Sequence, residues 1–350
     1  MKRRWRLLAG LGAIAATLVV VPVVGIDVGC RAGPVPSVAM PSPVPRGERR
    51  PEARTWLTYP EWHIVYAAES LGRYLAAGGR PSSYDYGADV AGFWRSYCAI
   101  HRVAGARAGA ADAKLMIAII GISFTAEMAV KAAWENIVGR LSEALGGWHS
   151  PEDRYAAAVQ QRYGAFMHET PWYGFDFAGA LGGLWRTSGG WSLVRRPERR
   201  VALTGEYGVK ALYAKGIGAL AGLQPDQTTL LMVVRASPAE IVAVDPRFRA
   251  IASGGGRTMV RVPRYAQLTD LIGMLAGRGI GIDDIAGNTT IFVTVRAPDR
   301  LRPRDVLVAM PLGDRPGWSR YGVTLPVAGL TRWIAVARAS GAEIEHVYDY

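Results

Sequence analysis

Two stretches of this sequence place an acid four residues before a base, a spacing that can hold an ion pair or support proton transfer. Glu127 precedes Lys131 beyond the apolar run "LMIAIIGI", and Glu206 precedes Lys210 in the same way. On a helix these pairs share a face, and Glu before Lys is the favoured order for an intrahelical ion pair. A single acid in an apolar helix is also a candidate for catalysis or proton relay. Both interpretations of Glu127 stay open at this point.

An internal repeat favours the structural interpretation. "TAEMAVKAAWENIVGRL" (125–141) aligns with "TGEYGVKALYAKGIGAL" (204–220). The positions expected on one helical face are Glu127, Lys131, Trp134, Val138 and Leu141 in the first copy, and Glu206, Lys210, Tyr213, Ile217 and Leu220 in the second. We therefore predict two helices that pack as a pair, with structural ion pairs within each helix and cross-pairs such as Glu127 with Lys210.

The triplet "EWH" supplies two further catalytic candidates, Glu61 and His63. Residues two apart on a helix do not face each other, so a joint role requires a loop or a strand. The alternative is an acid at the start of a helix and a packed histidine. The sequence contains no Glu-x-x-His motif and no closely spaced Cys and His residues. We therefore predict no metal and no cofactor.

The N-terminal end of the sequence has the pattern of a membrane anchor. The basic cluster Lys2-Arg3-Arg4-Trp5-Arg6 precedes Leu7–Ile26, a run of uncharged residues long enough to span a bilayer as a helix. The positive-inside rule places this cluster in the cytoplasm and the body across the membrane. The prediction is a single-pass protein of the bacterial inner membrane, with its partner membrane contacted through Leu7–Ile26 and its body in the periplasm.

Charge and cysteine content bound the function further. The net charge is +12, and residues 1–32 hold five Lys or Arg against one Asp, so +8 remains for the other residues. Charge of this size without a recognisable nucleic-acid-binding motif predicts no nucleic-acid partner. The two cysteines, Cys30 and Cys98, are expected as unpaired thiols, with a disulfide as the alternative.

The patterning divides the chain into four parts: 1–32, cytoplasmic tip and anchor; 33–54, a proline-rich linker expected to be extended and semi-rigid; 55–224, a helical domain; and 225–350, a duplicated α/β domain. Expected helices are 59–78, 87–105, 112–145, 152–168, 176–186 and 198–222. Ser150-Pro151-Glu152-Asp153 is a helix start. The apolar run 115–126 is short for a second span and is expected to be a buried core helix.

The C-terminal part contains its own repeat. "TTLLMVVRA" (228–236) matches "TTIFVTVRA" (289–297), and "AQLTDLIGMLAGRGIGIDDI" (266–285) matches "AGLTRWIAVARASGAEIEHV" (328–347). Each copy is expected to form a strand, a short helix or turn, two strands, a longer helix and a strand. This is the order of a ferredoxin-like βαββαβ unit. The fold class is therefore α+β: an N-terminal transmembrane helix, a mainly helical domain and a tandem pair of ferredoxin-like units.

Clustered arginines and aromatic residues suggest a surface that rests at lipid headgroups. Arginine clusters attract anionic lipid, and Trp and Tyr are enriched at membrane interfaces. The candidates for this membrane-surface role are Arg195, Arg196, Arg199, Arg200, Trp172 and Tyr173. The alternative for the aromatic residues is packing between helices.

Several strings together resemble a known family: "TYPEWHIVY", "FTAEMAVKAAWENIVGRL", "SPEDRYAA", "TPWYGFDF", "RRPERRVALTGEYGVKALYA" and "EHVYDY". The chain is similar over residues 56–350 to an uncharacterised family of bacterial proteins with one N-terminal membrane anchor and no assigned activity. The resemblance implies the anchored architecture and no particular chemistry.

Two functions are carried forward. We expect a non-enzymatic envelope protein that acts as a binding or scaffold module, with a protein or small-molecule partner at the tandem C-terminal region. The alternative is a periplasmic enzyme with hydrolase-like acid–base chemistry in the helical domain. Clustering of Glu61, His63 and Glu127 around one pocket would favour the enzyme, and their dispersal would favour the binding module.

Overall fold

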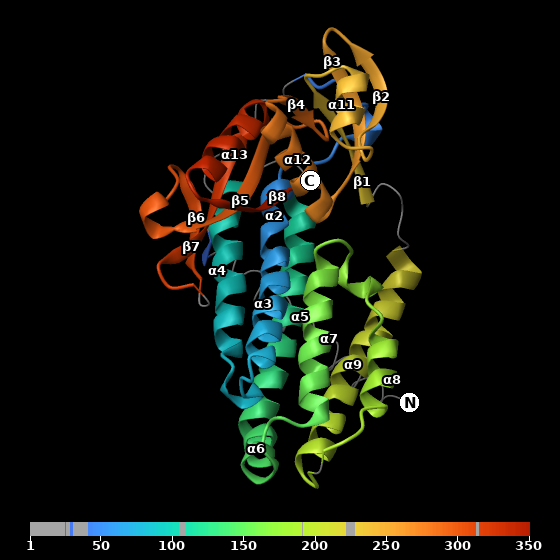
Figure 1. Ribbon diagram of the computed structural model, residues 1–350, viewed down its shortest axis with the longest axis vertical. Helices are drawn as coiled ribbons and strands as arrows, with labels where there is room; N and C mark the ends of the chain where they lie inside the picture. Colours follow the sequence, from blue (N-terminus) through green and yellow to red (C-terminus); the bar gives the residue numbers. More distant parts are fainter. Residues whose placement is uncertain are drawn as a thin grey trace, which may run out of the picture.

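The computed structural model describes Gly25, Gly29–Cys30 and residues 41–104, 110–190, 192–221, 228–312 and 315–350. A bundle of long helices carries two antiparallel four-stranded sheets at one end (Figure 1). The predicted α+β class is confirmed. Apart from Gly25, the predicted transmembrane helix Leu7–Ile26 lies outside the described residues.

The long helices lie where the hydrophobic periodicity predicts them, with ends within three residues of the expected positions. They are α3 (Tyr59–Ala76), α4 (Tyr86–Ala104), α5 (Ala110–Trp134) continued by the one-turn π-helix η3 (Glu135–Gly139) and α6 (Arg140–Gly146), α7 (Pro151–Met167), α8 (Phe177–Trp185) and α9 (Arg195–Ala221). Short helix α2 (Arg54–Leu57) precedes them, and the 3-10 turns η1 (Arg46–Glu48), η2 (Pro81–Ser83) and η4 (Trp172–Gly174) lie between elements. The predicted start of α7 has a capping box, in which the Asp153 amide donates to Ser150 Oγ and the Ser150 amide donates to Asp153 Oδ2.

The two sheets have the same topology. The first contains β1 (Thr229–Val234), β2 (Arg249–Gly254), β3 (Arg257–Pro263) and β4 (Ile282–Ile285), with helices α11 (Pro238–Val244) and α12 (Tyr265–Arg278). The second contains β5 (Thr290–Pro298), β6 (Val306–Pro311), β7 (Trp318–Pro326) and β8 (Glu343–Tyr348), with η5 (Asp299–Leu301), η6 (Val327–Gly329) and α13 (Leu330–Ala339). Their strand orders, β2-β3-β1-β4 and β6-β7-β5-β8, are equivalent, because in both the first strand lies between the third and the fourth. In the second unit the 3-10 turn η5 takes the place of helix α11.

The helices and the second sheet share one hydrophobic core. Thr55 Oγ1 donates to the carbonyl oxygen of Tyr348 at 2.5 Å and accepts from the Phe292 amide at 3.0 Å. The fully buried Trp56 donates through Nε1 to Thr324 Oγ1 at 2.8 Å. The ring of Tyr59 also packs edge-on against Phe292. The start of the helical region therefore contacts both central strands of the second sheet, β5 through Phe292 and β7 through Thr324.

The end of the predicted linker packs against the first sheet. Val44 is fully buried in a small cluster with Leu231 and Val233. The Arg50 amide donates to the carbonyl oxygen of Ala286 at 2.9 Å, and Asn288 Nδ2 donates to the carbonyl oxygen of Arg50 at 3.0 Å. The described part of this segment is therefore held against the first sheet.

A disulfide joins Cys30 to Cys98 of α4, so the expectation of two unpaired thiols is wrong. The two Cα atoms are 5.0 Å apart, within the range that a disulfide requires. His101, one helical turn further along α4, donates from Nδ1 to the carbonyl oxygen of Cys30. In the sequence, Cys30 lies four residues after Ile26, the end of the predicted anchor.

Candidate functional site

Helices α5 and α9 meet through a ring of four charges, formed by Glu127, Lys131, Glu206 and Lys210. Lys131 Nζ lies 3.0 Å from Glu127 Oε1 and 2.8 Å from Glu206 Oε1. Lys210 Nζ lies 2.8 Å from Glu127 Oε1 and 3.3 Å from Glu206 Oε1. Each lysine therefore contacts both acids, and the cross-pair between Glu127 and Lys210 is present as the repeat predicts. We call this group the charge ring.

The charge ring holds its members ionised. Burial by itself raises the pKa of Glu127, but Lys210 and Lys131 outweigh burial and hold that pKa at about 2. Burial likewise lowers the pKa of Lys131, and the two acids raise it well above its ordinary value. A carboxylate with so low a pKa is a poor proton acceptor near neutral pH. The geometry therefore supports the structural role of Glu127 and gives no support to its catalytic candidacy.

The π-helix η3 changes which residues of the first helix face α9. A π turn adds one residue to the helical repeat, so every later position is rotated relative to the earlier ones. The buried positions after Lys131, up to the end of α6, become Glu135, Gly139, Ser142 and Glu143. Val138 and Leu141, predicted on the inner face, are 37% and 62% exposed. That part of the predicted face is therefore wrong.

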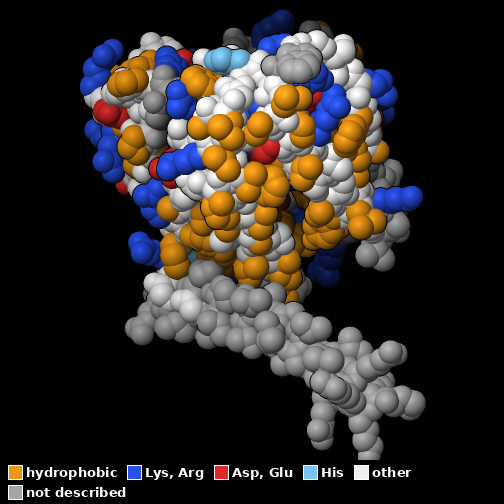
Figure 2. Space-filling model, turned by 90° about the horizontal axis from the view of Figure 1, so that it is seen from below, with side chains coloured by type: hydrophobic (Ala, Val, Ile, Leu, Met, Phe, Trp, Pro, Cys, Tyr) orange, Lys and Arg blue, Asp and Glu red, His pale blue; other side chains and the backbone are white. Residues whose placement is uncertain are grey.

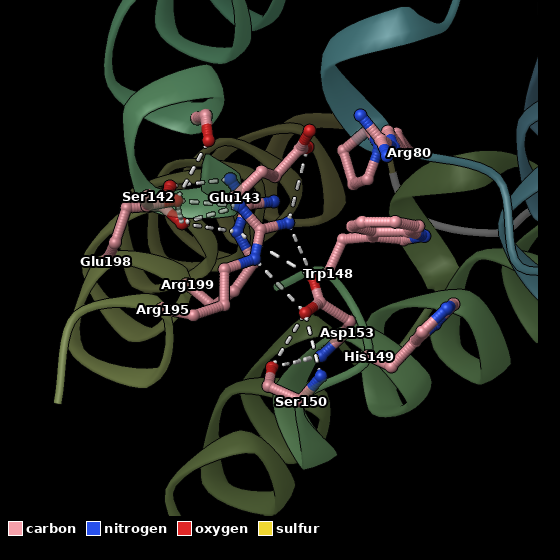
Figure 3. A network of polar contacts seen from close by, with 12 residues as sticks. Arg80, Ser142, Glu143, Trp148, His149, Ser150, Asp153, Arg195, Glu198 and Arg199 are labelled. Carbon is pink, nitrogen blue, oxygen red and sulfur yellow. Dashed lines mark hydrogen bonds and ion pairs between the residues drawn. The ribbon is translucent and has the colours of Figure 1, made fainter. Parts of the chain in front are cut away.

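A second charged group lies further along the same contact, beyond η3. Arg195 donates from Nη2 to Asp153 Oδ1 at 2.7 Å, and from Nη1 to Glu198 Oε2 at 3.0 Å and to Ser142 Oγ at 2.8 Å. Arg199 contacts both Glu135 (2.8 Å) and Glu198 (2.6 Å). Figure 3 shows side chains from three helices pointing toward one another: Ser142 and Glu143 of α6, Asp153 of α7, and Arg195, Glu198 and Arg199 of α9. We call Arg195, Arg199, Glu135, Glu143, Asp153 and Glu198 the arginine cluster.

The arginine cluster contradicts the membrane-surface role predicted for the arginines. The side chains of Arg195 and Arg199 are 0% and 4% exposed, so neither reaches a lipid headgroup. Arg196 and Arg200 both bind the carboxylate of Glu152, each at 3.0 Å, and that carboxylate is fully buried. The charge run in the sequence is therefore directed at carboxylates of other helices, because desolvated arginines need such partners.

The two aromatic candidates also pack within the bundle. The ring of Trp172 lies 5.4 Å from that of Tyr213 on α9 and 6.4 Å from that of Phe177 on α8. Tyr173 is half-buried beside it, with ring centroids 6.2 Å apart. This is the packing between helices that formed the alternative interpretation of these residues.

The remaining catalytic candidates do not form a site with Glu127. Glu61 and His63 both lie on α3, where residues two apart point in different directions. Burial lowers the pKa of His63 to about 4, and its Nε2 donates to the carbonyl oxygen of Asp89 at 3.1 Å. Burial raises the pKa of Glu61 to about 7, opposed by Arg54 and Arg264. The three candidates are thus distributed among separate environments.

One acid–imidazole pair was not predicted from the sequence. His168 Nε2 and Glu69 Oε1 lie 2.6 Å apart, and both side chains are 28% exposed. Trp62 packs its ring 5.2 Å from that of His168 and 3.6 Å from that of His346. Since the pair joins α3 to the residue that follows α7, 99 positions away, no local spacing could have identified it.

The outer surface of the bundle is strongly apolar. Among the described residues, 19 large hydrophobic side chains are exposed, and 15 of these belong to 115–145 or 185–213. The most exposed are Leu193, Leu212, Ile137, Val130, Val209 and Leu145. Figure 2 shows hydrophobic side chains gathered across the lower half of the described surface, with Lys and Arg mainly toward its edges. We call the exposed hydrophobic side chains of these two ranges the apolar face.

Much of the apolar face belongs to one continuous helix. Ala113–Gly146 is, within the described residues, a helix long and apolar enough to cross a membrane by length and composition, and 28% of its most apolar window is buried. The run 115–126 was predicted to be a buried core helix. That prediction fails for Leu115, Met116 and Ile119, which are 52%, 55% and 42% exposed.

A cleft where α6 is joined to α7 is small. It has a volume of about 230 Å³ and is lined by Trp148, His149, Arg154 and Arg196, among others (Figure 3). Ligand pockets usually enclose about 300–1,000 Å³. Within the described ranges, no three His, Cys, Asp or Glu side chains are grouped so that they could hold a metal ion.

The chain has no significant match among known family models, curated proteins or solved structures. Its resemblance to the anchored bacterial family therefore stays a prediction, and function has to be argued from the geometry.

Proposed function

We propose that this protein is a single-pass, membrane-anchored protein of the bacterial cell envelope, and that its periplasmic body is a non-enzymatic binding or scaffold module. The anchor is Leu7–Ile26, with the basic cluster before it in the cytoplasm. We further assign both C-terminal units to the ferredoxin-like type, a proposal supported by their equivalent strand orders.

The disulfide supports the proposal that the body lies in the periplasm. Disulfides form and persist in oxidising compartments such as the periplasm and are rare in the cytosol. Cys30 is 2% exposed and Cys98 is half-buried. The bond between them links a residue close after the predicted anchor to the helical bundle. A body in the cytoplasm would not be expected to keep this bond.

The observation that carries the binding role is the apolar face. Soluble proteins rarely expose large contiguous apolar patches, and such patches commonly mark contact with another protein or a membrane. The sequence placed the partner at the tandem C-terminal region. The proposal now places the principal contact on the helical bundle instead, because most exposed hydrophobic side chains among the described residues lie there.

Three measurements on cells test this proposal. We expect the protein to resist alkaline carbonate extraction, a reporter fused after Tyr350 to be active only in the periplasm, and Cys30 and Cys98 to resist alkylation until a reductant is added. A protein released by carbonate, a reporter active in the cytoplasm, or free thiols in intact cells would contradict it.

The alternative, a periplasmic hydrolase-like enzyme, is favoured by one observation. Glu69 holds His168 at 2.6 Å, and a carboxylate that orients an imidazole is a common part of acid–base sites. If this pair is catalytic, His168→Ala should abolish cellular function without lowering the melting temperature. If it is structural, function should survive wherever the fold does, and the enzymatic alternative falls.

A further inference from the structure

Most charges on the helix that carries much of the apolar face are paired within the protein, since Glu127, Lys131, Glu135 and Glu143 all form ion pairs. Among the described residues between Ala113 and Gly146, Arg140 is the one charged side chain that is well exposed. Glu127 and Lys131 lie in the same span but are 32% and 14% exposed and belong to the charge ring, whose formal charge sums to zero. A surface that meets lipid has to avoid unpaired charge, because an uncompensated charge in an apolar medium is costly.

Helix α9 also exposes hydrophobic side chains. Val201, Val209 and Leu212 are 61%, 69% and 75% exposed, and their spacing of eight and three residues places them on one side of the helix. Trp185 and Tyr213, both more than half exposed, add the amphipathic rings that are enriched at membrane interfaces. A helix with an extended apolar side of this kind is suited to lie in the plane of a bilayer surface.

The disulfide limits how far this surface can be from the membrane. Ile26, the last residue of the proposed anchor, is four residues from Cys30, a reach of at most about 14 Å. Cys98 holds Cys30 to α4, and α4 packs directly on α5, where Trp94 Nε1 donates to Thr125 Oγ1 at 3.0 Å. The helix that carries much of the apolar face is therefore next to the helix that is fixed near the bilayer.

We propose that the apolar face is seated on the outer surface of the membrane that holds the anchor, with phospholipid as its partner. The inference rests on the proposed anchor, and it adds a second, lateral membrane contact made by α5, η3, α6 and α9. A transverse span gives only one point of attachment. A second, lateral contact fixes the orientation of the body, and with it that of the two sheets, relative to the bilayer.

The experiment uses the full chain, with its disulfide intact, reconstituted into vesicles of phosphatidylcholine and phosphatidylglycerol. A carbene photoprobe carried on the lipid acyl chains labels residues that meet the bilayer, and the sites are mapped by mass spectrometry. We expect peptides from 115–145 and 201–213 to be labelled at least about tenfold more than α11 and α13, because only the former enter the acyl region. Val242 of α11 and Val336 of α13 are matched controls, since they are 47% and 63% exposed.

A pair of variants sharpens the result. Val209→Glu with Leu212→Glu should lower labelling of α5 and α9 at least about fivefold, because it puts charge into the contact. Val242→Glu with Val336→Glu should leave labelling unchanged. Melting temperatures check that both variants fold, and if the α9 variant does not, the labelling map of the unaltered protein decides alone.

The outcomes separate this inference from the proposed function. Labelled residues 7–26 with an unlabelled apolar face would keep the anchor and overturn the lateral contact. An unlabelled 7–26 would overturn the anchor itself. Crosslinks between two copies through 115–145, with no lipid label there, would assign the face to self-association and also overturn the inference.

Discussion

The charge ring and the arginine cluster use the same chemistry along one contact between helices, and they differ in their access to water. Side chains of the charge ring are 12–32% exposed, whereas the acidic side chains that contact Arg195 are 5–8% exposed. Ion pairs near solvent gain little net free energy, while a buried pair that loses one partner leaves an uncompensated charge. The comparison therefore predicts that substitutions in the arginine cluster, at one end of the bundle, destabilise the protein more than substitutions in the charge ring.

Removing the central arginine should have the largest effect. Arg195→Ala leaves Asp153, Glu198 and Ser142 without their shared donor in a buried site. We expect the free energy of unfolding to fall by about 3–5 kcal/mol, measured by urea denaturation. Arg200→Ala is the control, since Glu152 keeps Arg196 as a partner and the expected loss is below about 1 kcal/mol. Equal losses in both variants would contradict the distinction between the fully buried Arg195 and the partly exposed Arg200.

The sequence could predict the charge ring but not the arginine cluster, and the reason is physical. An acid four residues before a lysine occurs at matching positions in both copies of the repeat, so each pair identifies one face of a helix. Where two such faces pack together, each acid lies next to the lysine of the other helix. Glu198 lies within "RRPERR" itself, but the other acids that contact Arg195, Glu143 and Asp153, come from α6 and the start of α7, and no periodic pattern links them to this run. A solvated charge run and a buried one look alike until tertiary packing brings the acids to it.

The same reasoning separates the elements that were predicted from those that were not. Helix ranges and the tandem repeat follow from local periodicity, which the structure keeps. The π turn at Glu135–Gly139 is not marked by composition, so positions such as Leu141 were assigned to the wrong side of the helix. The disulfide between Cys30 and Cys98 bridges 68 residues, and sequence alone gives no distance between them.

Breaking the charge ring should have an intermediate effect. Glu127→Ala leaves Glu206 in contact with both lysines, so the ring loses one acid but retains two pairs. We expect a loss of about 1–2 kcal/mol in the free energy of unfolding, between the values for exposed and buried pairs. Glu127→Leu with Lys131→Leu should recover much of this loss, because Glu206 and Lys210 remain a matched pair. A double variant less stable than the single one would show that the ring is not a self-contained unit.

Acid should weaken the ring in a defined window. The pKa of Glu127 is about 2 in the folded protein and near 4.5 in the unfolded chain, so the unfolded chain binds more protons between these values. The stability that this residue contributes is therefore present above about pH 4.5 and is lost as the pH falls toward 2. One group changes stability by at most about 1.4 kcal/mol per pH unit. Urea denaturation at pH 5 and pH 3 should show a smaller acid loss in Glu127→Gln than in the unaltered protein, and parallel losses would place the acid sensitivity elsewhere.

The smallest effect on stability should come from the apolar face. Leu212 is 75% exposed, so Leu212→Ser removes little buried area and should change the free energy of unfolding by no more than about 0.5 kcal/mol. Leu203 is the matched control on the same helix, since it is 6% exposed, and Leu203→Ser should cost several times more because it puts a hydroxyl into the core. If the face has a partner, Leu212→Ser should instead weaken the attachment of the body in membranes while the melting temperature in detergent stays the same. A large fall in melting temperature for Leu212→Ser would mean that this side chain is covered within the folded chain, and the contrast between a sensitive interior cluster and a tolerant outer face would not hold.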